Sequence, residues 1–352
     1  MFKLNPLTLK QVRRFKSIKR GYVSLIIFTA MILFSLFAEF FVSNRAIFVR
    51  YNGKNYFPTY GDIIPGKKFG LDYDYETDYR KLKKTFYKDN NGNFVILALV
   101  PYNAFESNEE DFRDGGYPPF PPSIARWHYL GTDKVGRDVL ARLIYGFRIA
   151  VFFSLLLLAF NYVVGVSIGC IMGYFGGKFD LVFQRIIEIW TNVPYLYAII
   201  IISSIMVPSF FTLLGIMVFF GWIGMTWYMR TATYKERERE YVLAAKALGA
   251  SNKRIIFRHI LPNTISIIVT FVPFSIASGI TALTALDYLG FGLRPPTPSW
   301  GQLLSEASQF TIKAPWIGIS IISALIIVLT MVTFIGEAIR EAFDPKMHTI
   351  YE

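Results

Sequence analysis

The sequence predicts an all-α polytopic membrane protein with six transmembrane helices and a small mixed extracytoplasmic insertion between helices 1 and 2. Of its 352 residues, 53% are hydrophobic and 18% are charged, whereas soluble globular proteins average about 45–50% and about 25%. Aromatic residues make up 17% of the chain, as expected where rings populate the membrane interfaces. This composition excludes a disordered or collagen-like chain, and the single cysteine, Cys170, excludes a disulfide scaffold.

Six apolar runs predict the membrane-spanning helices, because a hydrocarbon core of about 30 Å needs roughly 20 helical residues. The runs are 21–43, 149–174, 189–206, 210–229, 263–286 and 314–335. The first run carries one charged residue, Glu39, and the others carry none. Since the first run is too long for the apolar core of a cleavable signal and no A-x-A-like site follows it, we expect an uncleaved signal anchor.

The distribution of basic residues predicts that both termini face the cytoplasm. The N-terminal basic segment, 1–20, contains seven Lys/Arg and no Asp/Glu, and short segments rich in Lys/Arg stay on the cytoplasmic side. Residues 230–262 contain eight Lys/Arg, whereas the short loops on the other side contain only Arg294 and Lys313. An even number of spans returns the tail, 339–352, to the cytoplasm. The net charge of +12 therefore reflects topology, and we expect no nucleic-acid partner.

Residues 44–148 form a long segment between the first two spans, which this topology places outside the cell membrane. The segment is rich in turn-forming residues, such as the Asn90-Asn91-Gly92-Asn93 stretch, and contains one strand-like run, 94–100. With about 100 residues and no disulfide, it is near the lower size limit for an independently folded domain. We expect a small mixed lobe that leans on the membrane helices or on a partner.

No arrangement of residues predicts catalysis or metal binding. The three histidines, His128, His259 and His348, lie in three different regions, and no Ser/His/Asp, Cys/His or metal-ligand spacing is present. No G-x-x-x-x-G-K-[ST] motif occurs, so the chain has no P-loop with which to hold ATP. The glycine-rich stretch 173–177 predicts a tight turn at the end of a membrane helix. We expect a non-enzymatic chain without cofactors, and any chemical energy that it uses must come from another subunit.

The cytoplasmic loop 231–262 predicts two short helices joined by a sharp turn. In the first helix, Val242, Ala245 and Leu248 recur at helical spacing, so one face is apolar and can dock.

The turn and the second helix have their own signals. Gly249 suits the left-handed conformation that ends many helices. Ser251 suits the N-cap of a second helix over 252–260, which we expect Pro262 to end just before the fifth span.

This loop resembles the EAA loop of ATP-binding cassette (ABC) importer permeases, which has the pattern E-A-A-x-x-x-G followed by a distal L-P. Leu243 stands where the family has glutamate, Glu240 one turn earlier is the candidate substitute, and His259 occupies a usually aliphatic position. In the family this loop is the coupling helix, which enters a groove of the ATP-hydrolysing subunit. The coupling residues that the resemblance implies are Glu240, Ala244, Ala245, Gly249, Arg258, Leu261 and Pro262.

Two further stretches resemble signatures of the dipeptide and oligopeptide branch of these permeases. Residues 130–139 (LGTDKVGRDV) resemble the LGTDxxGRD signature before the second span, and 289–301 (LGFGLRPPTPSWG) resemble the LGxG…PPxPxWG signature after the fifth. With the 173–177 stretch and the EAA-like loop, four motifs occur in family order over 126–345. The signature residues, whose role stays open, are Gly131, Thr132, Asp133, Gly136, Arg137, Asp138, Asp180, Gly290, Pro296, Trp300 and Gly301.

The segment 44–125 is longer than in ordinary dipeptide permeases. Together with the stretches 50–58 (RYNGKNYFP) and 335–345 (IGEAIREAFDP), this length resembles the permease of microcin C-type peptide importers.

The resemblance implies a type I ABC importer permease fold with its core at 149–338, in the cytoplasmic (inner) membrane of a bacterium. It implies a heterodimer with a second homologous permease, two ATP-binding domains that bind ATP and Mg, an extracytoplasmic solute-binding protein and a peptide-like cargo moved by alternating access. Two other classes stay open. One is a stand-alone channel or secondary transporter, and the other is a membrane-anchored helix-turn-helix regulator built on 244–251.

Several charged residues have a structural as well as a functional interpretation. Asp133, Arg137 and Asp138 suit capping and salt bridges at the start of the second span, and the alternative is gating or contact with a partner. Asp287 and Glu39 lie near the outer ends of their spans, where we expect the carboxylates to reach water.

Asp180 and Glu188 flank the cytoplasmic start of the third span, where pairing with Arg185 is the structural interpretation. Prolines and glycines inside the spans suit either kinks of a translocation path or packing between helices, namely Pro194, Pro273, Gly221, Gly224 and Gly279. The polar residues Asn161, Asn192, Thr270 and Ser275 leave the same two alternatives open.

Overall fold

The structure is a computed structural model that describes residues 6–89, 92–107 and 116–344. The predictions that concern the first five residues, Asn90, Asn91, His348 and the end of the tail beyond residue 344 fall outside these residues.

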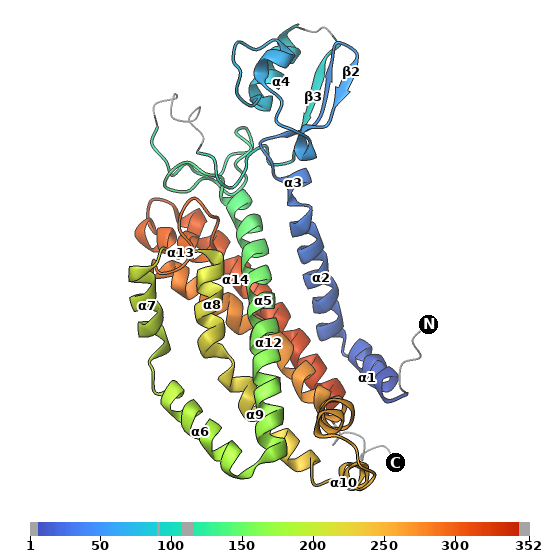
Figure 1. Ribbon diagram of the computed structural model, residues 1–352. Coiled ribbons are helices and arrows are strands. Elements are labelled where there is room, and N and C mark those ends of the chain that lie inside the picture. The colour runs from blue at the N-terminus through green and yellow to red at the C-terminus, as the bar shows by residue number, and fades with distance from the viewer. Residues whose placement is uncertain (1–5, 90–91, 108–115, 345–352) are drawn as a thin grey trace.

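Long helices run side by side along the molecule and form its bundle (Figure 1). Five helical segments of the described chain are long and apolar enough to cross a membrane, and a bent pair makes a sixth if it is one span. The bundle helices are α2 (Lys19–Leu36), α5 (Val139–Phe175), α8 (Phe210–Gly221), α9 (Ile223–Glu236), α12 (Leu261–Tyr288) and α14 (Pro315–Phe343). The prediction of a helical, polytopic membrane protein is confirmed.

Several helices extend beyond the apolar runs that predicted them. Helix α5 begins at Val139, ten residues before 149, so part of the predicted insertion belongs to this helix. Helix α14 continues to Phe343 instead of ending at 335. The first span ends at Leu36, and a short helix, α3 (Ala38–Phe41), follows it. Hydropathy marks the part of a helix inside the hydrocarbon, whereas caps and packing decide where the helix itself ends.

The third span is broken in two. Helices α6 (Gly177–Thr191) and α7 (Tyr195–Ile205) meet at an angle of 68°. Pro194 stands directly before α7, and a proline has no N–H to continue the hydrogen bonds of the preceding helix. The predicted run 189–206 therefore straddles a bend.

Helices α5 and α9 are in near contact along their backbones. Gly165, Gly169 and Gly173 lie on the face of α5 that meets α9, and a Cβ on any of them would lie 2.5–2.6 Å from a carbonyl oxygen of α9. Small residues at this spacing let two membrane helices approach closely. Beyond them, Gly176 and Gly177 have φ of +62° and +53°, so the predicted tight turn after α5 is confirmed.

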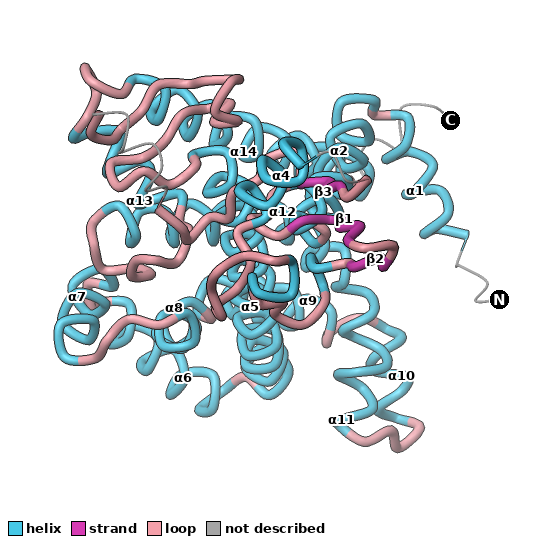
Figure 2. The backbone as a smooth tube through the Cα atoms, turned by 90° about the horizontal axis from the view of Figure 1, so that it is seen from above, coloured by secondary structure: helices cyan, strands magenta, loops and turns pink. Residues whose placement is uncertain are grey.

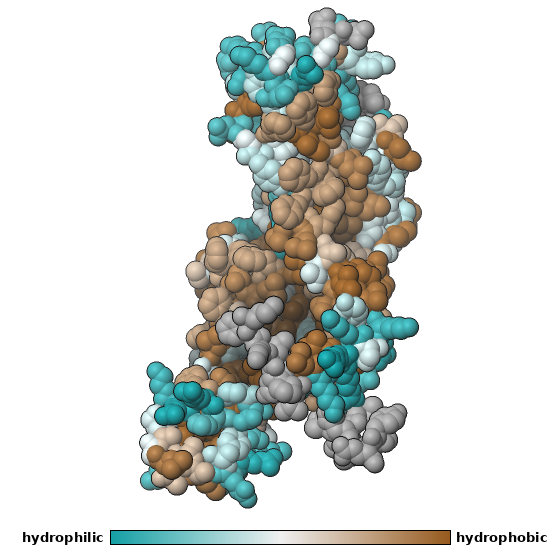
Figure 3. Space-filling view, turned by 90° about the vertical axis from the view of Figure 1, so that its right-hand side faces the viewer, coloured by the Kyte–Doolittle hydropathy of each residue, from teal (hydrophilic) through white to brown (hydrophobic). Residues whose placement is uncertain are grey.

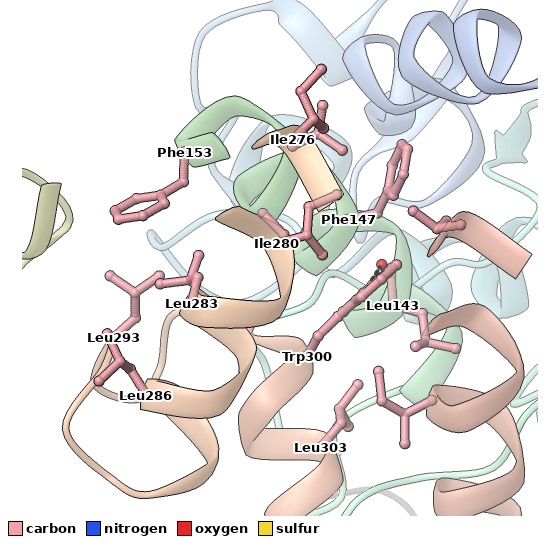
Figure 4. Close-up of a cluster of buried hydrophobic side chains, with 14 of the residues drawn as sticks. Leu143, Phe147, Phe153, Ile276, Ile280, Leu283, Leu286, Leu293, Trp300 and Leu303 are labelled. Atoms are coloured by element: carbon pink, nitrogen blue, oxygen red, sulfur yellow. Dashed lines mark hydrogen bonds between the residues drawn. The ribbon is translucent and has the colours of Figure 1, made fainter. Parts of the chain in front are cut away.

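The main core lies where α5, α12 and α14 meet the short helix α13 (Trp300–Gln309). In Figure 4, Trp300 points from α13 toward Leu143 and Phe147 of α5. The Trp300 and Phe147 rings are 5.9 Å apart, and the Trp300 indole N–H donates to the Leu143 carbonyl at 2.9 Å. A tryptophan that is both buried and hydrogen-bonded fixes the position of α13 on the bundle.

The insertion folds as a small mixed lobe at one end of the bundle, as predicted (Figure 1). Its antiparallel sheet has the order β2-β1-β3, formed by β1 (Ala46–Tyr51), β2 (Lys54–Tyr56) and β3 (Phe94–Leu97). Its helical elements are α4 (Tyr79–Asp89) and the 3₁₀ turns η1 (Pro58–Tyr60) and η2 (Gly66–Phe69). Strand β3 covers only the first part of the predicted run 94–100.

The lobe has a core of its own and a separate junction with the helices. Phe69, Leu82 and Phe86 are among the side chains that pack against the sheet. At the junction, the Tyr145 hydroxyl of α5 donates to the Val42 carbonyl at 3.1 Å.

The hydropathy of the molecular surface changes along the axis of the bundle. Figure 3 shows hydrophobic side chains around the middle of the molecule and hydrophilic side chains toward both ends. This pattern fits a multi-pass protein whose middle faces lipid.

Candidate functional site

The EAA-like loop forms a bent projection at the end of the bundle opposite the lobe (Figure 1). It consists of α10 (Glu240–Ala247), a turn, α11 (Asn252–Arg254) and the π-helical turn η4 (Ile255–Ile260), which leads into α12. We call residues 240–260 the elbow. Figure 2 shows α10 and α11 on one side of the bundle, away from α6 and α7.

The turn of the elbow has the predicted chemistry. Gly249 has φ of +78°, the left-handed conformation expected there. Its missing Cβ would meet no atom within 4 Å, so the backbone conformation alone favours glycine. The Ser251 side chain accepts the Arg254 backbone N–H at 3.4 Å and caps α11, which confirms the predicted cap.

Two predictions about the elbow are wrong. Pro262 does not end a helix, because α11, η4 and α12 follow one another without a break. The π-helical turn shifts the hydrogen-bond pattern just before the proline, and the Asn263 amide donates to the His259 carbonyl at 2.7 Å. Leu248 does not belong to the buried face, because it lies at the C-cap and is 88% exposed.

The elbow has a buried face and an exposed face. Val242 is buried with Ile255 and Ile260, and these side chains join α10 to the foot of α12. On the other face, Leu243 is 51% exposed, and Leu248 projects further.

The residues implied by the resemblance are divided between these faces. Ala245 is buried and Leu261 is half-buried. The exposed ones are Glu240, Ala244, Gly249, Arg258 and Pro262.

Hydrogen bonds hold the elbow, and the C-cap of α9 just before it, to the end of α5. The Arg237 guanidinium donates to the carbonyls of Gly173 and Tyr174 at 3.4 and 3.3 Å. The Tyr174 hydroxyl donates to the Asn252 side chain at 2.8 Å. Burial raises the pKa of Tyr241 to about 12, and its hydroxyl donates to Glu236 at 2.6 Å.

Asp180 joins α6 to α9 close to this end. The Arg230 guanidinium donates to both of its carboxylate oxygens, at 2.6 and 2.5 Å. The predicted pairing with Arg185 is therefore confirmed for Glu188 and wrong for Asp180.

The first signature stretch lies at the opposite end of the bundle, in a buried cluster of four charges. Asp133 accepts hydrogen bonds from Arg137 at 2.7 Å and from Arg142 at 2.5 Å. Glu306 of α13 lies 3.3 Å from Arg142 and 3.5 Å from Arg137. None of the four residues is more than 6% exposed. We call Asp133, Arg137, Arg142 and Glu306 the charge cluster; its formal charges cancel.

Asp138 caps α5, as predicted. One of its carboxylate oxygens accepts the Ala141 backbone N–H at 2.7 Å, and the other lies 2.8 Å from Nδ1 of His128. Gly131 and Gly136 shape the loop before it, with φ of +74° and +82°.

Other side chains of this stretch help to shape the loop. The Thr132 hydroxyl accepts the Phe120 backbone N–H at 2.8 Å. The capping and salt-bridge interpretation of Asp133, Arg137 and Asp138 thus agrees with the geometry.

The second signature stretch packs against the same region. Gly290 has φ of +83° just after α12, and a cis peptide bond precedes Pro296. A Cβ on Gly301 would lie 2.2 Å from the Thr284 carbonyl oxygen, so α13 can approach α12 only with glycine there. With Trp300 against α5, this stretch holds α13 between two spans.

The prediction that the Asp287 carboxylate reaches water is wrong. It is 5% exposed and accepts the Leu293 backbone N–H at 2.6 Å and the Ser299 hydroxyl at 2.5 Å. Glu39 lies nearer the surface and pairs with Arg148 at 2.8 Å.

Sequence reasoning missed Arg142, Glu306, His128 and Gln302 as members of the buried network. The Gln302 side-chain oxygen accepts from Arg142 at 3.0 Å. A signal was present, since Arg142 lies three residues after Val139 in a run rich in Leu and Ile. Because residues 139–148 were assigned to the insertion, Arg142 was not recognised as a charged residue buried in a membrane helix.

Within the described ranges, no group of three His, Cys, Asp or Glu residues is placed to hold a metal ion. The two signature regions offer packing surfaces and ion pairs.

Comparison with known proteins shows the family of the chain. Residues 165–349 match the family of binding-protein-dependent transport system inner membrane components. The chain is 40% identical to the inner membrane ABC transporter permease protein YejE of Escherichia coli (strain K12), over 98% of this chain and 99% of the relative. It is 39% identical to the peptidoglycan transport system permease protein YejE of Agrobacterium fabrum (strain C58), over 97% and 94%.

A third relative covers less of the chain. The dipeptide transport system permease protein DppC of Haemophilus influenzae is 33% identical over 74% of this chain and 93% of its own length. The chain is thus a multi-pass inner membrane permease, and it belongs to the family of binding-protein-dependent transport system inner membrane components.

Proposed function

We propose that this chain is one of two homologous permease subunits in an ATP-driven importer of peptides or peptide-like solutes. Relatives named for peptidoglycan and dipeptide transport support this class of cargo. Two partner ATP-binding domains hold ATP and Mg, and an extracytoplasmic solute-binding protein delivers the cargo.

The exposed face of the elbow carries the coupling role in this proposal. Leu243 and Leu248 present apolar surface at the tip of a projection that bears several basic residues, which favours a cytoplasmic position. An apolar protrusion of this kind is suited to a groove on another subunit, because a partner that covers the exposed leucines removes their apolar surface from water.

The contacts of the elbow with the spans can transmit its movement to them directly. Val242 packs on Ile255 and Ile260 of η4, which continues into α12, and the Tyr174 hydroxyl of α5 donates to the Asn252 side chain. Packed elements shift as rigid bodies because their interiors do not deform continuously. Closure of the ATP-binding domains therefore moves α5, α9 and α12 together and opens the permease toward the outside, and ATP hydrolysis returns them.

Contacts at the same end of the molecule support the orientation that we propose. The Arg14 guanidinium of α1 (Pro6–Ser17) donates to the Asp344 carbonyl at 3.3 Å, so the first helix and the end of α14 lie together. Both termini and the elbow face the cytoplasm, while the lobe and α13 face the solute-binding protein.

The substitution Leu248→Asp tests the coupling role. We expect it to weaken retention of the ATP-binding subunits by about 30-fold, because burying an unpaired charge at the centre of an interface costs roughly 2 kcal/mol. The measurement is the amount of ATP-binding subunit that copurifies with the tagged permease at graded salt.

Ile312→Asp is the matched control, since Ile312 is 94% exposed and lies at the end of the molecule that carries α13. It should leave copurification unchanged. Equal retention by wild type and Leu248→Asp would contradict the proposed coupling face.

A further inference from the structure

A cavity of about 520 Å³, partly open at the surface of the bundle, lies among α5, the α6–α7 break, the α8–α9 junction and α12. This volume falls within the roughly 300–1,000 Å³ typical of small-molecule sites. Its wall is mainly apolar, and no Asp, Glu, Lys or Arg of the described residues lines it. The side chains in the wall that carry a polar atom are Asn161, Tyr162, Trp190, Thr191, Tyr195, Tyr228, Ser275 and Ser278.

Asn161 has an unusual hydrogen-bonding state for a residue inside a membrane helix. Its Oδ1 is buried and has no hydrogen-bond partner among the residues that the structure describes. Next to it, the Tyr162 and Ser275 hydroxyls are 2.7 Å apart and join α5 to α12. An unsatisfied amide oxygen is costly in a low-dielectric interior, so a ligand that donates a hydrogen bond to it is favoured.

The cavity also lies where the helices are interrupted. α6 and α7 are separated at residues 192–194, α8 and α9 are separated at Trp222, and α12 contains Pro273. The Phe219 carbonyl at the second interruption accepts both the Trp190 and the Trp222 indole N–H, at 3.2 and 3.0 Å. Irregular backbone at membrane depth is tolerated where it lines a cavity, and breaks of this kind mark transport sites.

Glycine leaves room for the Asn161 side chain. A Cβ on Gly221 would lie 2.4 Å from Nδ2 of Asn161, so any larger residue at 221 must displace the amide. Gly221 therefore positions Asn161, and it also lines the cavity.

We propose that this cavity is a binding subsite for an uncharged stretch of peptide backbone during transport. Asn161 Oδ1 accepts a peptide N–H, the Tyr162 and Ser275 hydroxyls face a peptide carbonyl, and the apolar wall receives small neutral side chains. The absence of charged lining residues in the described chain disfavours phosphate headgroups and the charged ends of peptides. The unsatisfied amide disfavours an acyl chain. This inference rests on the proposed function and specifies which part of the cargo the chain contacts.

Uptake by the reconstituted importer tests the subsite. The complete complex, with its solute-binding protein, is placed in proteoliposomes with a radiolabelled mixture of tri- to hexapeptides from a protein hydrolysate. Asn161→Leu removes the amide at nearly constant volume and should raise the KM for uptake by roughly three- to tenfold, the equivalent of one hydrogen bond. Gly221→Ala should raise it in the same direction by a smaller factor.

Val163→Leu is the matched control, because Val163 lies on the same helix and is 67% exposed. It should retain the wild-type KM. A wild-type KM for Asn161→Leu would overturn the subsite, whereas failure of the wild-type complex to import any peptide would overturn the proposed function instead.

Thiol labelling gives a readout that does not depend on transport by Asn161→Leu. In the complete complex, Asn161→Cys should react with a small methanethiosulfonate reagent, and the peptide mixture should slow that reaction severalfold. Wild type, in which Cys170 is buried, sets the background, and Val163→Cys should react at a rate that peptide does not change. Absent labelling of Asn161→Cys, or labelling indifferent to peptide, would show that a partner helix or lipid fills the cavity and would overturn the proposal.

Discussion

The two ends of the bundle carry family-like motifs of opposite character. At the elbow, Leu243 and Leu248 face outward from a short helix held by few buried side chains. At the other end, the charge cluster is enclosed and electrically neutral within the chain. The difference shows that two sequence signatures of one family can have different physical roles. Within this chain the elbow leaves Leu243 and Leu248 uncovered, whereas the charge cluster pairs its two carboxylates with its two guanidinium groups, leaves Nε of Arg142 without a partner among the described residues, and fixes α13 on α5.

The largest effect is expected from Arg142→Met. The substitution leaves Asp133 and Glu306 buried with only Arg137 between them, which should destabilise the fold by about 3–5 kcal/mol. Thermal unfolding of the purified permease in detergent measures the loss.

Lys246→Met makes the same change of charge on the exposed elbow and should shift stability by no more than about 0.5 kcal/mol. Unfolding of the two variants at the same temperature would contradict the difference in stability contribution between the charge cluster and the exposed elbow.

A smaller effect is expected from Asp138→Ala. It removes the cap of α5 and leaves His128 without its carboxylate partner, so we expect a loss of about 1–2 kcal/mol. The same thermal unfolding assay applies. Asp138→Asn keeps an acceptor for the Ala141 N–H and should recover part of the loss, and an alanine variant as stable as wild type would exclude a structural role for this residue.

Gly249→Ala should have a similar or slightly smaller cost at the elbow, about 1 kcal/mol, because φ of +78° strains any residue with a Cβ. Since no atom lies near the missing Cβ, steric overlap adds nothing. Hydrogen exchange of the 240–254 amides should rise while exchange at the start of α5 stays unchanged. Faster exchange throughout the chain would mean that the elbow is not a separate local unit.

The smallest stability effect is expected from Leu248→Ser. Leu248 makes few contacts within the chain, so the free energy of unfolding should change by less than about 0.5 kcal/mol. Coupling should nevertheless fall, seen as ATP hydrolysis by the complete complex that transported peptide no longer stimulates. Normal stimulation would place the coupling contact elsewhere on the elbow.

Local signals in the sequence predicted much of the architecture. Apolar runs indicated the spans because membrane burial requires them, and Ser251 and Gly249 indicated the elbow turn because caps act within a few residues. A kink at Pro194 was one of two open alternatives, and the continuity through Pro262 was not predicted, since both depend on how neighbouring turns share hydrogen bonds.

The charge cluster shows where sequence reasoning reaches its limit. Arg142 and Glu306 are 164 residues apart in the chain and meet only when α13 packs on α5. The Asp287 carboxylate was likewise predicted to reach water, but the Leu293 N–H and the Ser299 hydroxyl donate hydrogen bonds to it inside the fold. Long-range partners such as these are set by tertiary packing, which a single sequence does not display.

Labelling of Leu248→Cys with a membrane-impermeant maleimide tests the central claim most directly. The account predicts no reaction in intact cells, rapid reaction in inverted membrane vesicles that contain the permease alone, and protection when the ATP-binding subunits are coexpressed. Reaction from the outside of intact cells, or equal reaction with and without those subunits, would contradict the claim that the elbow lies in the cytoplasm and binds the ATP-binding subunits.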